Sequence, residues 1–137
     1  TPSPECVARF LGASNILAAQ AKGRENGAVM LESPIFGRLP VPAEKAPQLN
    51  GDGRAKLVIR AEKLLLCPRG AQGDGVATVD ARVETVDYQG QAVRYFVRAG
   101  DTQLQAINMI DGHPFAEGTE VTLHLRPRDC AALPEDR

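Results

Sequence analysis

Two segments of the chain, residues 53–66 and 118–133, have nearly the same order of residue types. Each begins at a glycine and continues as an apolar-rich run that ends in an arginine, Arg60 in the first copy and Arg126 in the second. A small residue or proline follows, then an acidic residue, and then leucine. Because side chains alternate between the two faces of a strand, each copy predicts a short strand that ends in a tight turn. The repetition predicts two β units of related design.

The stretch between the N-terminal region and the first copy is typical of a β-meander. Runs rich in apolar residues at 16–21, 28–32 and 36–41 are separated by turn-forming residues. The first separator contains Asn26-Gly27, which favours a two-residue hairpin because both residues tolerate a positive φ. We expect three antiparallel strands here.

The second half of the chain has the same texture. Residues 76–87 alternate between polar and apolar side chains, and further β-type runs follow at 92–98 and 103–109. Many short strands at close spacing are typical of an all-β barrel or sandwich. The sequence therefore predicts an all-β domain of short antiparallel strands, built from two related halves at about 13–67 and 76–134.

The N-terminal residues include those that typically begin and end a short helix. Ser3 can cap it, Pro4 suits its first position, and Gly12 can end it. We expect a helix within residues 1–12, as the end of a linker from an upstream domain, followed by one β domain over 13–137. The chain does not begin with methionine, which led us to expect a fragment of a longer protein.

Composition excludes several partners. The formal net charge is −1, with 16 Lys+Arg against 17 Asp+Glu, so no strong field would attract nucleic acid or anionic lipid. Apolar runs are far shorter than the ~20 residues of a membrane helix, so we expect no direct membrane insertion. Stacking of bases in an OB-type groove needs exposed aromatic side chains, and the chain has 2 Tyr, 4 Phe and no Trp. Nucleic-acid binding is therefore the least favoured alternative.

No residue pattern predicts catalysis or a resident cofactor. Cys6, Cys67 and Cys130 are widely spaced, without the close pairs of a zinc site, and are expected to be structural thiols. The glycine-rich segment 70–75 lacks the lysine of a phosphate-binding loop. We expect no catalytic, metal or cofactor-binding residue, and interpret His113 and His124 as structural or surface residues.

Four motifs, taken in order, resemble a known family. Residues 10–17 are similar to the junction after the nucleotide-binding domain of an ABC-importer ATPase, most of all in the spermidine/putrescine or ferric-iron importer branch. Residues 59–62 resemble a hydrophobic-Arg-Pro-Glu motif, 83–90 a valine-rich strand leading to Tyr-x-Gly, and 118–133 a terminal strand followed by Pro-x-Asp. Together they resemble the TOBE, or transport-associated OB-like, domain over nearly the whole chain.

The resemblance implies an OB-like barrel with a regulatory role. It implies a C-terminal regulatory and dimerisation domain of an ATP-binding subunit, located in the cytoplasm at the inner face of the membrane. The expected partners are a second copy in a homodimer, the upstream ATPase domain and the membrane permease subunits. ATP and Mg²⁺ would bind in the upstream domain and not in this chain, so the chain itself would not be an enzyme.

The residues that carry these motifs are the candidate interface or structural residues. They form two strand-end groups and one hairpin group, and they are Arg60, Glu62, Tyr88, Gly90, Arg126, Pro127 and Asp129. The arginine of each strand-end group can pair with its own acidic neighbour, Arg60 with Glu62 and Arg126 with Asp129. Such pairs either fix their own strand ends or make charge-assisted contacts in a dimer.

A different class of function also fits part of the sequence. Ser14-Asn15, just before a predicted strand, resembles the start of molybdate-binding members of the wider TOBE group. That resemblance implies a free-standing oxyanion-binding module, which would hold its ligand with backbone amides, serine and lysine. Calorimetry with molybdate, tungstate and sulfate distinguishes it from a regulatory domain.

Overall fold

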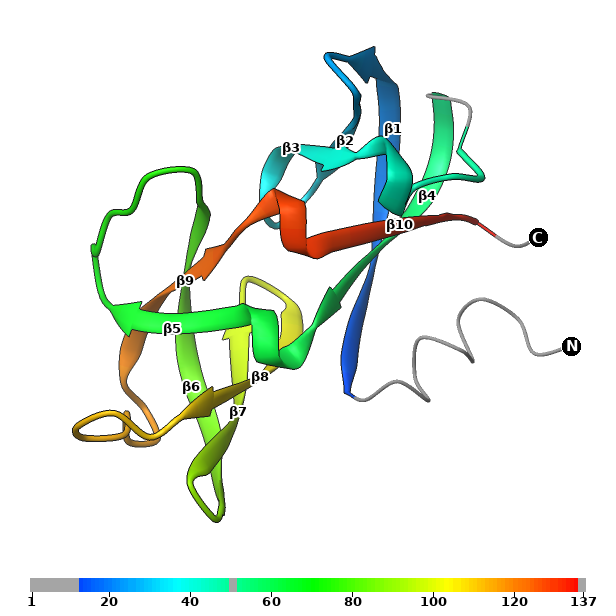
Figure 1. The fold of residues 1–137 in the computed structure, drawn as a ribbon. Helices are drawn as coiled ribbons and strands as arrows, with labels where there is room; N and C mark the ends of the chain where they lie inside the picture. The colour runs from blue at the N-terminus through cyan, green and yellow to red at the C-terminus, as the bar shows by residue number, and fades with distance from the viewer. Residues whose placement is uncertain (1–12, 50–51, 136–137) are drawn as a thin grey trace, which may run out of the picture.

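The computed structural model describes residues 13–49 and 52–135, which form two curled antiparallel sheets (Figure 1). The first sheet has the order β10-β4-β1-β2-β3 and contains β1 (Ser14–Glu25), β2 (Ala28–Ser33), β3 (Gly37–Pro42), β4 (Asp52–Arg60) and β10 (Cys130–Pro134). The second has the order β5-β9-β6-β7-β8 and contains β5 (Leu64–Pro68), β6 (Ala77–Gln89), β7 (Ala92–Ala99), β8 (Thr102–Met109) and β9 (Glu120–Leu125). The all-β prediction is confirmed, and the helix predicted within 1–12 lies outside the described residues.

Three short 3₁₀ turns connect the strands, η1 (Ala43–Lys45), η2 (Ala61–Lys63) and η3 (Pro127–Asp129). The predicted meander is β1-β2-β3, and its first turn is Asn26-Gly27, with φ of 50° and 78°. Positive φ at both central residues gives a turn whose twist matches that of the flanking strands. The hairpin prediction at this position is confirmed.

Each half of the chain contributes its last strand to the sheet of the other half. β5, which ends the first half, pairs with β9 in the second sheet, and β10, which ends the second half, pairs with β4 in the first sheet. In Figure 1, β10, coloured red because it lies near the C-terminus, therefore runs beside green β4. The short turns η2 and η3 are the places where the chain crosses from one sheet to the other.

Strand registers show that the two sheets are built alike. Ile59, near the end of β4, pairs with Asn15 on one side and Cys130 on the other. Leu125, at the end of β9, pairs in the same way with Ala77 and Leu64. Ile59 and Leu125 are therefore equivalent positions, and the repeated segments of the sequence are the strand-and-crossover units β4-η2-β5 and β9-η3-β10.

One hydrophobic core fills the space enclosed by the two sheets. Leu57 and Ile59 of β4 and Leu123 and Leu125 of β9 are 0% exposed. Burying a side chain of this size contributes ~1.5–3 kcal/mol. The alternation within both repeated segments thus places the same kind of side chain in the same core.

Cys130, at the start of β10, is part of this core. It is 0% exposed, and burial raises the pKa of its thiol to about 12. Burial also raises the pKa of the half-buried Cys67 thiol. Both cysteines are free and, as protonated thiols at neutral pH, are poor nucleophiles.

Candidate functional site

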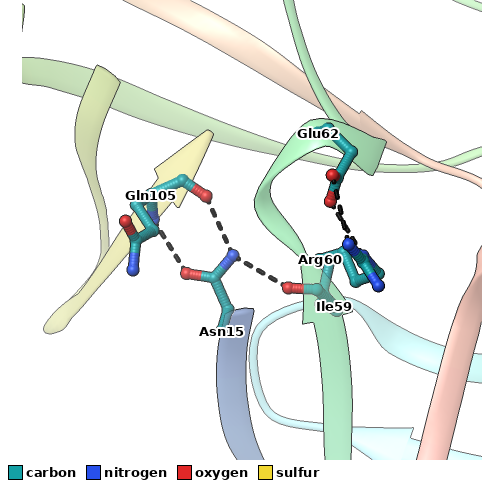
Figure 2. A network of polar contacts seen from close by, with 5 residues as sticks. All are labelled: Asn15, Ile59, Arg60, Glu62 and Gln105. Carbon is teal, nitrogen blue, oxygen red and sulfur yellow. Dashed lines mark hydrogen bonds and ion pairs between the residues drawn. The ribbon is translucent and has the colours of Figure 1, made fainter. Parts of the chain in front are cut away.

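Asn15, near the start of β1, joins the two sheets through its side chain (Figure 2). Its Nδ2 donates to the carbonyl oxygens of Gln105 on β8, at 2.9 Å, and of Ile59 on β4, at 3.2 Å. Its Oδ1 accepts the backbone N–H of Gln105 at 2.8 Å. Asn15 is only 7% exposed, so its carboxamide takes the place of a neighbouring strand along the open edge of β8.

Asn108, also on β8, does the same for the edge of β5. Its Oδ1 accepts the backbone N–H of Leu66 at 2.9 Å, and its Nδ2 donates to the carbonyl oxygen of Leu64 at 2.9 Å. Both contacts bring the edges of the second sheet together, since β5 and β8 are its outermost strands. Exposed strand edges readily pair with other chains, and side-chain capping prevents this.

Arg60 and Glu62 form a local ion pair at the first crossover (Figure 2). The Nε of Arg60 lies 2.9 Å from Oε1 of Glu62, and its second guanidinium nitrogen lies 3.4 Å from Oε2. The hydrogen bond from Arg60 lowers the pKa of the Glu62 carboxyl. Both side chains are partly exposed, at 41% and 49%, so solvent screens the pair. Within this chain it fixes the strand end to η2.

The second crossover does not repeat that ion pair. Pro127 is the first residue of η3, and the backbone N–H of Asp129 donates to the carbonyl oxygen of Arg126 at 2.9 Å. Within residues 13–49 and 52–135, no ion pair joins the side chains of Arg126 and Asp129. The arginine of the second copy therefore stays available to other groups.

Tyr88 and Gly90 lie in a different place, the hairpin between β6 and β7. Tyr88 is 62% exposed near the end of β6, and Gly90 has a φ of 65° in the turn that follows. A positive φ explains the glycine at this turn. Within the described residues, no hydrogen bond or ion pair joins this hairpin to the crossover residues, so the seven candidate residues do not form one site.

His124, on β9, is tied to the glycine-rich loop. Its Nε2 lies 2.9 Å from the carbonyl oxygen of Ala71, and a Cβ added at Gly73 would lie 3.3 Å from the ring. In the part of the chain that the structure describes, no group of three or more His, Cys, Asp or Glu side chains gathers as a metal site would require. The His124 ring therefore packs against the glycine-rich loop and holds it through the hydrogen bond to Ala71.

Asn15 belongs to a motif visible in the sequence, whereas its backbone partner Gln105 and the second capping residue, Asn108, were not predicted. Asparagine is depleted in strands, so Asn108 within the apolar run of β8 was a usable signal. Gln105 carried no signal, because its backbone makes the contacts with Asn15. None of these carboxamides is a nucleophile or a base, and their hydrogen bonds join the edges of the strands.

Comparison with known proteins identifies the family. A model of the TOBE domain matches residues 57–133, more than half of the chain, and the chain therefore belongs to the TOBE family. That match covers both crossovers and all strands of the second sheet. A search of curated proteins found no match.

The structure is also similar to that of the cytoplasmic molybdate-binding protein ModG with molybdate bound. The TM-score is 0.73, with 13% sequence identity, over 88% of this chain and 96% of that one. At this identity the likeness establishes the fold. None of the described residues belongs to a helix that is long and apolar enough to cross a membrane.

Proposed function

We propose that the chain is a non-catalytic regulatory module that works as part of a larger assembly. The particular role that we propose is the C-terminal regulatory and dimerisation domain of an ABC-importer ATP-binding subunit, located at the inner face of the cell membrane. The observation that carries this proposal is the use of Asn15, whose carboxamide is occupied by three contacts to the chain's own backbone. The Ser-Asn motif then serves the architecture of the domain, and the importer-like order of motifs along the chain supports the particular assembly.

The coding sequence upstream of Thr1 tests this proposal most directly. We expect it to encode a nucleotide-binding domain with a phosphate-binding loop, and the purified 137-residue chain to show no ATP hydrolysis. We also expect sedimentation to show a monomer or weak dimer for the chain alone and a tighter dimer for the full-length protein. A start codon next to Thr1, or ATP turnover by the chain itself, would contradict the proposal.

A second candidate function is oxyanion binding, and the likeness to ModG favours it over the importer role. The fold match extends over nearly all of both chains, and the bound ligand of that structure is molybdate. Against this, an anion that approached the Asn15 amide would have to displace its bonds to Gln105 and Ile59. Asn15 lines a small hollow of about 180 Å³, and none of the described Lys or Arg side chains lines it. Ser14 also lines a second hollow, of about 250 Å³, together with Lys45 and Arg60.

Calorimetry separates the two functions. Titration of the 137-residue chain with molybdate, tungstate and sulfate gives saturable heat at micromolar anion if the second function is correct. The regulatory proposal expects no saturable heat from any of the three. Asn15→Asp is the matched variant, since it keeps the size of the side chain and would repel an anion at this position.

A further inference from the structure

The junction that Asn15 closes has an equivalent in the other half of the molecule. Register equivalence places Ala77, on β6, where Asn15 stands on β1. The same comparison extends to the next strands. Leu39 of β3 pairs with Leu31 of β2, and Leu104 of β8 pairs with Val97 at the matching position of β7. Leu39 and Leu104 are therefore equivalent. The next residue is Gln105 in β8 and Pro40 in β3, so the equivalent junction lies between the start of β6 and β3.

This second junction cannot be closed in the same way. Ala77 has no carboxamide, and Pro40 has no backbone N–H to donate. A groove of about 620 Å³ opens here, between β3, the start of β6 and η3. Its floor is apolar: Pro40, Val76 and Pro127 are exposed or half-buried, and Phe36 and Leu39 lie buried beneath. A volume of this size lies in the range of ligand pockets, roughly 300–1,000 Å³.

Three exposed arginines line the groove, Arg38 from β3, Arg126 from the end of β9 and Arg128 from η3. No Asp or Glu side chain lines it. Among the described residues, none of the three makes an ion pair or a side-chain hydrogen bond. Four arginines elsewhere on the surface, Arg54, Arg60, Arg69 and Arg98, are each paired with a carboxylate of this chain. Arg82 of β6 is exposed and makes no ion pair among the described residues, but it stands apart from the groove.

The three unpaired arginines of the groove indicate what it would bind. Three guanidinium groups without internal partners favour an occupant that brings carboxylates, because the guanidinium fork matches that group. The apolar floor favours an occupant with apolar side chains as well. A single inorganic oxyanion would leave most of the volume and the floor unused, and the buried position of Phe36 offers no face for stacking a nucleobase.

We propose that this groove is a docking site for an acidic segment of a partner protein, in which carboxylates flank one or two large apolar side chains. The carboxylates pair with Arg38, Arg126 and Arg128 around the rim, and the apolar side chains pack on the accessible apolar lining, Pro40, Val76 and Pro127. Neither function proposed above assigns an occupant to this groove, although Arg126 and Pro127 are among the candidate interface residues. The groove gives the module a surface through which a partner protein reaches it.

Fluorescence anisotropy with labelled peptides tests the proposal on the 137-residue chain. The probe is Glu-Leu-Asp-Phe-Glu with an N-terminal fluorophore, and the matched control is Gln-Leu-Asn-Phe-Gln, which has the same shape without charge. We expect the acidic peptide to bind with an affinity that falls as salt rises, and the neutral peptide to bind about tenfold more weakly.

Variants assign the binding to the groove. Arg38→Gln combined with Arg128→Gln should weaken the acidic peptide about tenfold. Arg82→Gln, which removes an exposed arginine of β6 outside the groove, should leave binding unchanged. Equal urea midpoints for these proteins would show that the fold is intact, as expected for exposed side chains.

Several outcomes would overturn the proposal. They are no binding of the acidic peptide at about 1 mM, unchanged binding in the double variant, and equal weakening by Arg82→Gln. Displacement of the peptide by submillimolar molybdate or sulfate at constant ionic strength would instead assign the groove to free oxyanions. Tighter binding of a single-stranded oligonucleotide than of the peptide would assign it to nucleic acid.

Discussion

The two equivalent junctions of this domain differ at two positions, and this difference leaves one junction closed by hydrogen bonds and the other open. At the junction of β1 and β8, Asn15 and the backbone of Gln105 exchange hydrogen bonds and close the structure. At the junction of β6 and β3, Ala77 and Pro40 occupy the equivalent positions, and a groove lined by arginines lies there. A repeated architecture therefore does not repeat its sites. Closure and binding are alternative uses of the same place in the fold.

The strongest test of this comparison is Asn15→Leu. It removes three hydrogen bonds and takes away the side-chain partner of the part-buried N–H and C=O of Gln105 and of the Ile59 carbonyl. We expect a loss of about 2–4 kcal/mol in the free energy of unfolding. Urea unfolding followed by circular dichroism measures it, with Ala77→Leu as the matched control at the open junction. A loss below that of the control would show that the closed junction does not stabilise the fold.

A related variant, Asn15→Asp, separates hydrogen bonding from size. Its carboxylate would face the carbonyl oxygens of Gln105 and Ile59, which accept from Nδ2 in the native protein. The folded state then favours the neutral acid, so the destabilisation is greatest near neutral pH and decreases as the acid is protonated at low pH. Urea midpoints at pH 7 and pH 4, each compared with the native protein, measure this trend.

The second-largest effect is expected from Asn108→Leu, which opens the edge of β5. Two hydrogen bonds to Leu64 and Leu66 are lost, and we expect a cost of about 1–3 kcal/mol. Hydrogen exchange should show faster exchange of the Leu66 amide in particular. If that amide exchanges as slowly as in the native protein, Asn108 does not cap the edge.

A smaller effect tests whether the open junction can be converted into a closed one. The double variant Ala77→Asn, Pro40→Gln supplies the carboxamide and the backbone N–H that the closed junction uses. We expect stability to change by no more than about 1 kcal/mol, the new amide at position 40 to be protected from exchange, and the acidic peptide to bind less tightly. Ala77→Asn alone lacks the donor at position 40 and should give no such protection.

The smallest effect concerns the crossovers. Because the pKa of Glu62 lies below its ordinary value of 4.5 in the folded protein, its pair with Arg60 contributes stability above that pH. The contribution is lost as the pH falls through the lowered value. Glu62→Gln should therefore destabilise slightly at pH 7 and not at pH 2. Asp129→Asn at the second crossover, where no such pair exists, should show no comparable difference between the two pH values.

The sequence predicted features that depend on neighbours along the chain. Asn26-Gly27 formed the predicted hairpin, and Arg60 reached Glu62, two residues away. The side chain of Arg126 did not pair with that of Asp129, which is three residues away along the chain. Asp129 instead donates its backbone N–H to the carbonyl oxygen of Arg126. The partners of Asn15 lie up to 90 residues away, and no local pattern encodes such a distance. The groove was not predicted either. It depends on the missing carboxamide of Ala77 and the missing backbone N–H of Pro40, and neither absence gives a pattern in the sequence.

The exchange of final strands between the halves has a consequence for how the protein is made. β10, which pairs with β4 and so completes the first sheet, consists of residues 130–134 and is synthesised after the other described strands. Until then the first sheet lacks one of its borders, and Ile59 and Leu57 lack the neighbours that cover them. The second sheet needs only β5–β9, whereas the first sheet is incomplete until residues 130–134 have been made. Deletion of residues 130–134 should therefore harm the first sheet more than the second.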